Sequence, residues 1–308
     1  MGFGEKFTRY VRTLFNAPRA NIITNDVLSG TFSLTRGCRQ GCPSSPLLFA
    51  IAIEPLAVAI RTSASISGIK FGTSEHKLSL YADDLLLYIM DPLKSIPSLM
   101  KCLKEYSAAS GYKINYTKSE IMPLNIQESR IRALTDPLQW CNNGFTYLGI
   151  QIGKSEDQIF KLNYIKLLEQ TKLIIQRWMD FPLSLIGRIN VIKMNTLPKF
   201  IYLFQCLPTN VPKSFFKELN KLITSFIWQK KNPRLKLSSL QAPYSRGGLN
   251  LPNFRNYYLA SQYRSIWIWL HAERSEFVCF CLFCNLKMKN KAYKKKNIKK
   301  KMNYLCLQ

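Results

Sequence analysis

Hydrophobic and polar positions follow two different periods along the chain, and the change falls near residue 155. Before that point, short alternating stretches are interleaved with stretches of helical period. An opening amphipathic helix is predicted to end at Ala17-Pro18, and a hairpin with its turn near Asn25-Asp26 follows. The apolar positions of the opening helix are Phe3, Phe7, Tyr10, Val11 and Leu14.

The same reasoning divides the rest of the first section into helices and strands. Helices are predicted over residues 46–60 and 95–109, the second ended by Gly111, with a hairpin over 77–90 between them. Further strands are predicted over 113–122 and 146–152. Strands covered on one face by two helices make a two-layer α/β sandwich, so residues 1–154 are predicted to be one α+β domain.

From residue 155 to 272 the apolar positions recur at helical spacing, as in Leu162, Ile165 and Leu168. This section is therefore predicted to be a separate helical domain. Residues 273–308 contain a cysteine-bearing stretch, and from residue 287 on they are rich in lysine and have no acid. We expect that tail to be disordered and to bind polyanions without specificity.

The charge balance narrows the classes of function. The 308 residues include 44 Lys and Arg against 18 Asp and Glu, a net charge of +26. Such an excess favours a polyanionic partner, most simply nucleic acid, over a routine small-molecule enzyme. Nine cysteines, an odd number, suggest reduced thiols in an intracellular protein. The longest apolar stretch is interrupted by Glu54 and Pro55, so we expect no transmembrane helix and no membrane partner.

Two neighbouring carboxylates, Asp83 and Asp84, stand in the middle of the apolar stretch 78–89, Leu-Ser-Leu-Tyr-Ala-Asp-Asp-Leu-Leu-Leu-Tyr-Ile. Aspartate is common in β-turns, which is the plain structural interpretation. It does not explain the lack of other polar residues nearby. Two like charges in an apolar setting repel each other, and a divalent cation with hard oxygen ligands, Mg²⁺ or Mn²⁺, relieves that repulsion. Metal binding is the functional interpretation.

A second motif lies before the helix predicted over 46–60. Residues 36–49 read Arg-Gly-Cys-Arg-Gln-Gly-Cys-Pro-Ser-Ser-Pro-Leu-Leu-Phe. Backbone amides at a helix start, with guanidinium groups beside them, suit a phosphate or a nucleotide. The alternative is that the glycines serve only the turn.

The order of the motifs is more informative than each motif alone. The Arg-Gln-Gly helix start at 39–41 is followed by Tyr-Ala-Asp-Asp, then by Ser-Gly-Tyr-Lys-Ile-Asn with a lysine at 118, then by Tyr-Leu-Gly-Ile at 147–150. This succession resembles the palm of reverse transcriptases, specifically those of LINE-type non-LTR retrotransposons. Further similarity in residues 187–190, 197–199, 226–228 and 247–252 extends the resemblance into the thumb, so that it covers about residues 2–271.

The resemblance implies a polymerase-like palm followed by a helical thumb, and an RNA-directed DNA polymerase that extends a primer 3′-end by two-metal nucleotidyl transfer. RNA template, DNA primer and deoxynucleoside triphosphates would be its partners, and Mg²⁺ or Mn²⁺ its cofactor. Asp83 and Asp84 match the metal-binding catalytic pair, and Lys118 the lysine that protonates or steadies the leaving pyrophosphate. The positions that match the template- and nucleotide-binding motif are Arg39, Gln40, Gly41 and Ser45, and those that match the primer grip are Tyr147, Leu148 and Gly149.

One element of the family pattern has no match. Its first palm motif, an Asp on a strand, should precede the Arg-Gln-Gly element, where this sequence offers only Glu5 and Asp26 as acids, neither in an apolar strand. We therefore expect a truncated polymerase with little or no activity. The alternative is a catalytically inactive, basic RNA- or DNA-binding remnant. In both cases we expect an intracellular location, in the nucleus or in a cytoplasmic ribonucleoprotein.

Overall fold

The computed structural model describes residues 2–35, 37, 41–72, 74–124, 126, 129, 131–271 and 304–307, and every structural statement below refers to them. The chain divides into two compact units, Met1–Ala59 and Ile60–Gln308. This division falls inside a helix and not at the expected boundary after residue 154. The sheet that carries the aspartate pair and the helical region therefore belong to the same unit.

The described part of the first unit contains helix α1 (Glu5–Phe15), all but the end of helix α2 (Ser45–Thr62) and two short antiparallel ladders. Helix α1 follows the predicted pattern. Its ladders pair β1 (Arg19–Ala20) with β4 (Phe32–Ser33), and β2 (Ile23–Thr24) with β3 (Val27–Leu28). The turn lies at Asn25-Asp26 as predicted, and both residues have positive φ, as a type I′ hairpin turn requires.

Helix α2 (Ser45–Thr62) confirms the predicted helix, and it continues through Glu54 and Pro55. By length and composition it qualifies as a membrane-spanning candidate, with a mean hydropathy of 1.5 over 18 residues. The sequence-based exclusion of such a segment was therefore too strict. A single helix of this kind is weak support for a membrane location, because core helices of other proteins meet the same criterion.

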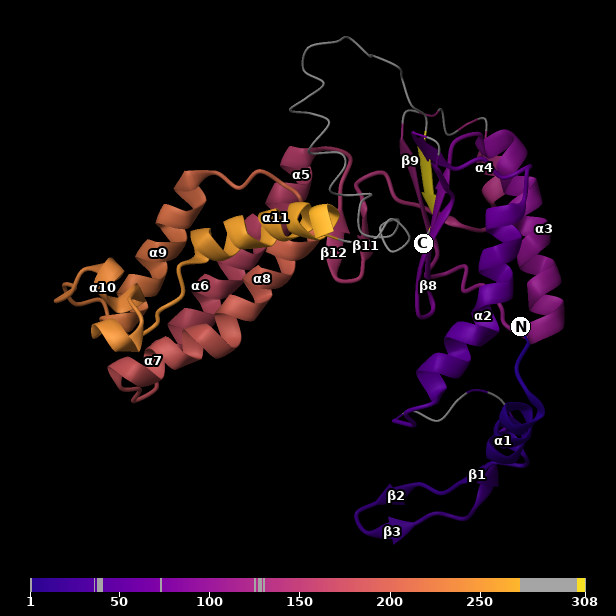
Figure 1. The fold of residues 1–308 in the computed structure, drawn as a ribbon, viewed down its shortest axis with the longest axis horizontal. Helices are drawn as coiled ribbons and strands as arrows, with labels where there is room; N and C mark the ends of the chain where they lie inside the picture. Colours follow the sequence, from indigo (N-terminus) through magenta and orange to yellow (C-terminus); the bar gives the residue numbers. More distant parts are fainter. Residues whose placement is uncertain are drawn as a thin grey trace. The chain divides into compact units, whose positions relative to one another are not determined.

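A five-stranded sheet organises the first part of the second unit (Figure 1). Its order is β10-β9-β13-β8-β7. The central strand β13 is antiparallel to both neighbours, so β8 and β9 run parallel to each other. The strands are β7 (Leu78–Tyr81), β8 (Asp84–Ile89), β9 (Glu120–Leu124), β10 (Gln139–Trp140) and β13 (Tyr304–Leu307).

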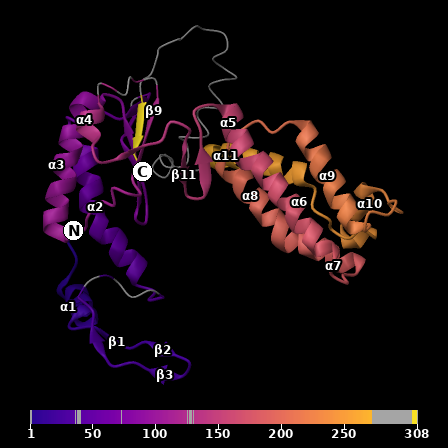
Figure 2. The ribbon, with the colours of Figure 1, turned by 180° about the vertical axis from the view of Figure 1, so that it is seen from behind.

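Helices cover one side of this sheet. Helix α3 (Pro92–Ser110) and the short α4 (Arg132–Thr135) lie on the side away from the hairpin of β11 (Phe145–Tyr147) and β12 (Ile150–Ile152), as Figures 1 and 2 show from opposite directions. Gly111, with φ of 74°, ends α3. The layered arrangement is the mixed helix-and-strand architecture expected of a palm. A small ladder of β5 (Ile69–Phe71) and β6 (Ser74–His76) precedes β7.

Two predicted strands and part of the tail differ from the structure. Residues 113–119 form no strand and end in a turn, so β9 starts only at Glu120. The stretch 146–152 is not one strand but part of the β11–β12 hairpin. In the tail, which was expected to be disordered, Tyr304–Leu307 forms β13, and the remainder lies outside the described residues.

Residues 156–271 are helical, as the apolar period predicts. Their core is built from buried aromatic side chains, among them Tyr164, Phe200, Phe204, Phe215 and Phe254. The helices are α5 (Glu156–Phe160), η2 (Lys161–Ile165), α6 (Lys166–Met179), α7 (Leu185–Val191), η3 (Ile192–Thr196), α8 (Leu197–Cys206), α9 (Lys213–Ile227), α10 (Leu237–Gln241), η4 (Tyr244–Arg246) and α11 (Phe254–His271).

Candidate active site

The aspartate pair lies at the tip of the β7–β8 hairpin. The last ladder pair is Tyr81 with Asp84, which leaves Ala82 and Asp83 as the turn. Ala82 has φ of 51°, and a positive φ at the first turn position is the feature of a type II′ hairpin turn. The strands thus end where the two carboxylates begin, and the turn places them side by side at one end of the sheet.

The two carboxylates differ in their surroundings. Asp83 is exposed, whereas Asp84 is half-buried at the first position of β8. The sequence suggested two desolvated charges together, but the apolar residues that suggested it are buried further along the strand, from Leu86 to Ile89. An exposed carboxylate beside a half-buried one leaves oxygen atoms free to bind a cation and its phosphate ligands.

The strand below the pair is anchored by a small apolar cluster. Leu86 and Tyr88 of β8 pack with Met122 of β9 and Phe145 of β11. The Tyr88 hydroxyl also lies 3.3 Å from the Ser79 hydroxyl across the hairpin. Because these contacts join the aspartate hairpin to the β11–β12 hairpin, the two hairpins are held on one base.

The β11–β12 hairpin turns at Leu148 and Gly149, two of the predicted primer-grip residues. Both have positive φ, 48° and 75°, which defines a type I′ turn. Glycine meets this requirement at no steric cost, but leucine rarely adopts it. Tyr147 is half-buried and packs against the apolar cluster below the aspartate pair.

Two residues of the helical region hold this hairpin in place. The Tyr202 hydroxyl on α8 donates a hydrogen bond to the carbonyl oxygen of Leu148. The buried Asn163 accepts a bond of 2.9 Å from the Gln151 amide and donates one of 2.8 Å to its carbonyl. Asn163 lies in the π-helical turn η2, a distortion that often marks functional positions.

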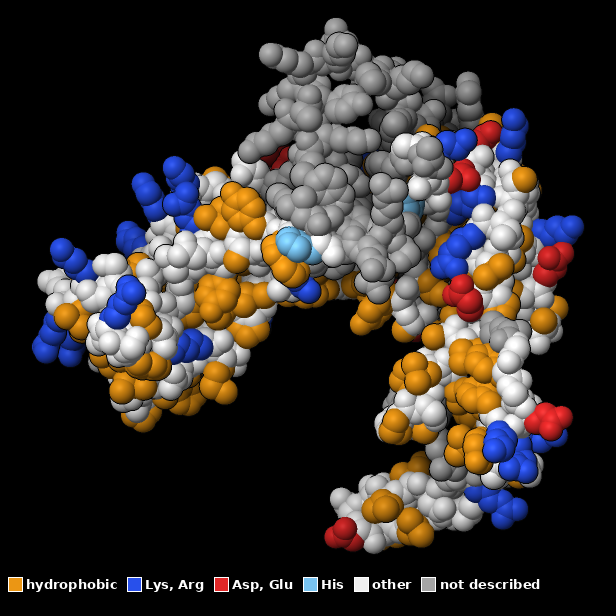
Figure 3. Space-filling model, viewed as in Figure 1, with side chains coloured by type: hydrophobic (Ala, Val, Ile, Leu, Met, Phe, Trp, Pro, Cys, Tyr) orange, Lys and Arg blue, Asp and Glu red, His pale blue; other side chains and the backbone are white. Residues whose placement is uncertain are grey.

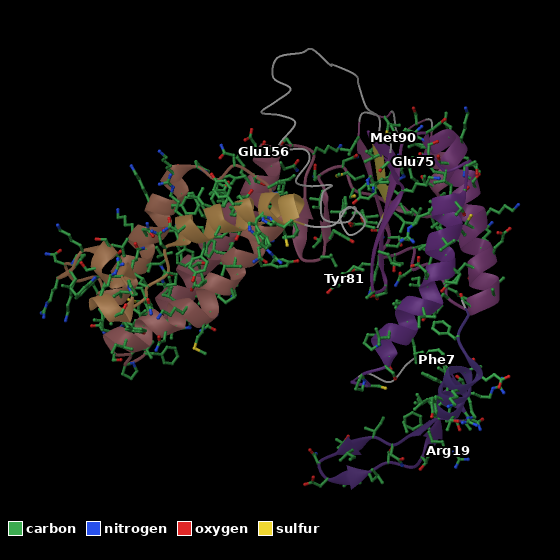
Figure 4. The ribbon with its side chains drawn as sticks, viewed as in Figure 1. Phe7, Arg19, Glu75, Tyr81, Met90 and Glu156 are labelled. Carbon is green, nitrogen blue, oxygen red and sulfur yellow. The ribbon has the colours of Figure 1, made fainter. Side chains whose placement is uncertain are left out.

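The Tyr202 hydroxyl, which binds the Leu148 carbonyl oxygen, has a raised pKa. Burial raises the pKa of Tyr202, and the nearby groups of Cys206 and Tyr81 raise it further. Tyr81 is the residue that pairs with Asp84, and Figure 4 shows it at the turn end of its hairpin. Tyr202 therefore joins a helix of the helical region to the Leu148 turn within the second unit.

Lys118 occupies an exposed turn two positions before β9. Its amide donates to the carbonyl of Asn115 at 3.1 Å, which fixes the turn but leaves the side chain extended into solvent. The structure brings its ammonium into no ion pair with Asp83 or Asp84 in the described part of the chain. A role beside the carboxylates therefore depends on substrate.

The helix-start motif belongs to the first unit and is described separately. Arg39 and Gln40 lie outside the described residues. Gly41 has φ of 82°, which glycine adopts freely, and Ser45 is buried at the first position of α2. The Ser44 hydroxyl, by hydrogen bonding, lowers the pKa of the Cys42 thiol to about 7.

Metal-binding capacity in the described residues rests on the aspartate pair. Across the ranges that the structure describes, no group of three or more His, Cys, Asp and Glu side chains could enclose a metal ion. Two adjacent carboxylates are nonetheless a suitable oxygen donor set for Mg²⁺, which often takes one or two protein carboxylates and completes its shell with water and phosphate oxygens. The donors fit one such ion better than a full two-ion cage.

Basic side chains gather on the helical region over α9 and the segment that follows it, as Figure 3 shows. All of these side chains are exposed, and the sequence between Glu218 and Glu273 contains no acid. Such a surface attracts phosphate groups by Coulombic forces and counterion release. The cations are Lys213, Lys217, Lys221, Lys230, Lys231, Arg234 and Lys236.

Sequence reasoning did not find Tyr202 or Asn163. Tyr202 stands in an apolar helical stretch that reads as core, and nothing local marks its hydroxyl. Asn163 gives a weak signal, because a polar amide among the apolar positions of a helix must find partners when it is buried.

Comparison with known proteins gives one family match and several similar proteins, which agree with one another. Residues 3–152 match the family described as reverse transcriptase (RNA-dependent DNA polymerase). A 149 kDa protein of transposon TX1 from Xenopus laevis, itself uncharacterized, is 28% identical over 282 residues, which is 90% of this chain and 21% of that protein. The chain thus spans about a fifth of this relative's length.

Two Pol polyproteins of R2 retrotransposable elements are also similar. That of the type-2 element R2DM from Drosophila melanogaster is 23% identical over 82% of this chain and 24% of its own length. That of the type-1 element R2 from Popillia japonica is 24% identical over 72% of this chain and 32% of its own length. The similarity to both extends past the sheet region into the helical one.

Proposed function

We propose that the second unit of this chain carries the nucleotidyl-transfer site of an RNA-directed DNA polymerase, because residues 3–152 match the reverse transcriptase family and the chain is similar to proteins of retrotransposable elements. The observation that carries the proposal is the aspartate turn, which is fixed on the same apolar base as the Leu148-Gly149 turn. An acid pair for the cation and a backbone turn for the primer end are the two parts that primer extension needs close together.

Asp83 and Asp84 are the residues that hold the divalent ion. When bound, the ion polarises the phosphate oxygens and favours ionisation of the primer 3′-hydroxyl. The exposed Asp83 meets the ion and substrate, while the half-buried Asp84 is held by its ladder pairing with Tyr81. The pairing fixes the direction of the acid pair before substrate arrives.

The remaining predicted residues take supporting roles. Lys118 closes on the leaving pyrophosphate from its exposed turn, where an ammonium both steadies negative charge and supplies a proton. The backbone of Tyr147, Leu148 and Gly149 holds the primer end, and the basic surface over α9 holds the duplex. Gly41 and Ser45, with Arg39 and Gln40, are the positions that the resemblance assigns to template and nucleotide binding.

One observation favours a second function. The described residues supply two carboxylates to the site, and no third metal-binding side chain among them groups with this pair. Loss of one shared carboxylate from a two-ion site costs about 4 kcal/mol or more of transition-state stabilisation, a rate loss of about a thousandfold. Under this alternative the chain binds primed RNA or DNA through its basic surface and turns over slowly or not at all.

Primer extension by the full chain tests both functions. Purified protein is given a primed RNA template, deoxynucleoside triphosphates and Mg²⁺ or Mn²⁺, and incorporation and template affinity are measured together. We expect Asp83→Asn to lower incorporation about a thousandfold or to background, with template affinity unchanged. Asp26→Asn is the matched control, because it removes the same charge from an exposed hairpin turn of the other unit.

Each outcome decides between the two functions. Metal-dependent incorporation that Asp83→Asn removes supports the polymerase. Salt-sensitive binding without incorporation supports the binding protein. Incorporation that survives both Asp83→Asn and Asp84→Asn would place the chemistry elsewhere and contradict the proposed site.

A further inference from the structure

The turn of the β11–β12 hairpin has one fixed carbonyl group and one open amide group. The Tyr202 hydroxyl on α8 donates a hydrogen bond to the carbonyl oxygen of Leu148. The amide of Gly149 belongs to the same peptide bond. Among the described residues it donates to no partner, because the last ladder pair is Tyr147 with Ile150. Gly149 is exposed, and a Cβ placed on it would meet no described atom within 4 Å. An unpaired donor therefore lies beside open space.

The planarity of the peptide bond couples these two groups. A trans peptide bond holds its carbonyl and its amide in one plane, pointing in opposite directions. Because Tyr202 holds the Leu148 carbonyl oxygen on the side of α8, the Gly149 amide points away from α8. The hydroxyl thus sets the direction of a donor that it does not touch.

Two orientations of this peptide bond are compatible with a two-residue hairpin. Turn types I′ and II′ both have positive φ at the first turn position and differ in the sign of φ at the second. The change from one type to the other rotates the central peptide plane by about 180°, so that the amide and the carbonyl exchange sides. Glycine at position 149 allows either sign, so the turn sequence leaves the choice open. The observed φ of 75° at Gly149 is that of type I′.

The strands on either side of this turn have little freedom. Asn163 holds both backbone groups of Gln151, and the Gln151 side-chain amide donates to the Thr146 hydroxyl across the ladder. Phe145 is buried in the apolar cluster below the aspartate pair. Since the strands are fixed from both sides, the central peptide of the turn remains as the variable part, and the Tyr202 bond acts on it.

Tyr202 is suited to this task. Burial raises its pKa above the ordinary value for tyrosine. A tyrosine hydroxyl donates only while it is protonated, so a raised pKa keeps the donor in place across the neutral pH range. Its neighbours along α8, Phe200 and Phe204, are buried in the aromatic core. The bond therefore links the turn to a rigid support.

We propose that Tyr202 is a positioning residue for primer extension, which fixes the Leu148-Gly149 peptide so that the Gly149 amide donates to a phosphate oxygen near the primer 3′-end. Phosphate oxygens commonly accept hydrogen bonds from backbone amides. This inference rests on the proposed function. It adds a residue of the helical region that acts on the primer through the turn.

Primer extension with a modified primer tests the role of Tyr202. The last linkage of the primer is either an ordinary phosphate or a neutral methylphosphonate, and kcat and KM are measured with the full chain. We expect Tyr202→Phe to lower kcat about fivefold, since loss of one hydrogen bond shifts the turn equilibrium by about that factor. KM for the duplex should stay unchanged, because the basic surface over α9 still holds it. Tyr257→Phe removes an exposed hydroxyl on α11 and is the matched control, which should behave as wild type does.

The methylphosphonate separates positioning of the primer from a merely structural role. It should lower kcat in the wild-type protein. Combined with Tyr202→Phe it should cost no more than the larger of the two changes alone, because both remove the same contact. Losses that multiply would overturn the proposal, and so would full activity of Tyr202→Phe.

A second readout keeps this inference separate from the polymerase proposal. A primer with 2-aminopurine at its 3′-end reports the position of that end by fluorescence, without any chemistry. At equal duplex affinity we expect Tyr202→Phe to change this fluorescence and Tyr257→Phe to leave it unchanged. Equal fluorescence of wild type and Tyr202→Phe overturns the inference, whether or not the protein incorporates nucleotide. Incorporation that Asp83→Asn removes and Tyr202→Phe leaves intact would overturn this inference alone, and absence of duplex binding would contradict both.

Discussion

The sheet region, residues 60–154, and the helical region, residues 155–271, are built on different principles although they share one unit. The helical region has a continuous core in which aromatic rings contact one another from α5 to α11. The sheet region has an apolar cluster around Leu86 and Phe145, further buried aliphatic residues such as Ile89, Ile96 and Leu99, and a central strand supplied from elsewhere in the chain. The core of the helical region is thus built largely on aromatic rings, and that of the sheet region mainly on aliphatic side chains.

Each region buries a charged side chain that is hydrogen-bonded to backbone carbonyl oxygens. In the helical region Arg188 is almost fully buried, and its guanidinium donates to the carbonyl oxygens of Leu183 and Phe226, each at 3.2 Å. It also lies over the Phe226 ring, 5.0 Å from its centre. In the sheet region Lys77 is buried, and its ammonium donates to the carbonyl oxygen of Ser63 at 2.6 Å.

The largest expected effect is the loss of an aromatic core residue. Phe200→Ala removes a buried ring that contacts Phe254 at 5.5 Å and should lower the free energy of unfolding by about 3–5 kcal/mol. Urea denaturation measures it, and Tyr257→Ala on the exposed face of α11 should change stability by less than about 0.5 kcal/mol. If the helical region supports the sheet region, hydrogen exchange in β8 should accelerate as well. Unchanged protection in β8 would show that the two regions are independent.

A smaller loss is expected for the buried guanidinium. Arg188→Met keeps the length of the side chain but leaves the carbonyls of Leu183 and Phe226 without their donor. We expect about 2–3 kcal/mol of destabilisation in thermal unfolding. The exposed Arg177→Met on α6 is the control, and equal effects of the two would mean that the buried bonds contribute nothing.

The contact between the regions should matter locally. Asn163→Ala removes both bonds to the Gln151 backbone and should cost about 1–2 kcal/mol. Amide exchange in β12 should rise more than in α9, because only the hairpin loses a partner. Asn195→Ala at an exposed position provides the comparison. A uniform rise over the whole second unit would argue against a local clamp.

The smallest effect concerns a surface ion pair of the helical region. Lys172 and Glu218 approach to 2.7 Å, but both side chains are about half exposed. Glu218→Gln should therefore change stability by less than about 0.5 kcal/mol, less still at high salt. It should instead strengthen binding to a nucleic acid, because it removes the acid from the basic surface over α9. Filter binding at two salt concentrations measures this.

Much of the fold follows from local sequence patterns. The helix predicted over 95–109 is observed as Pro92–Ser110, and Gly111 ends it in the left-handed conformation that glycine favours. The aspartate hairpin was found because apolar strand residues flank a pair of acids. Both signals act over a few residues, where period and turn chemistry decide the structure.

The errors arise where distant residues decide. Residues 113–119 alternate like a strand, yet no neighbouring strand pairs with them. The turn at Leu148 was missed because leucine is a poor residue for positive φ, and the surrounding ladder imposes it. β13 was missed because its partners lie far away in sequence. The contacts of Tyr202 and Asn163 are of the same kind, formed only after the two regions meet.

Alanine at the first position of the aspartate turn affects the orientation of the two carboxylates. An L-residue with a Cβ in the left-handed region costs about 1 kcal/mol relative to glycine. A chain selected for ease of folding would carry glycine or asparagine at position 82. Alanine has fewer accessible backbone conformations than glycine. Once the paired strands impose the turn, its backbone dihedral angles therefore vary little. The two acids that follow Ala82 are then held in a single direction by the turn.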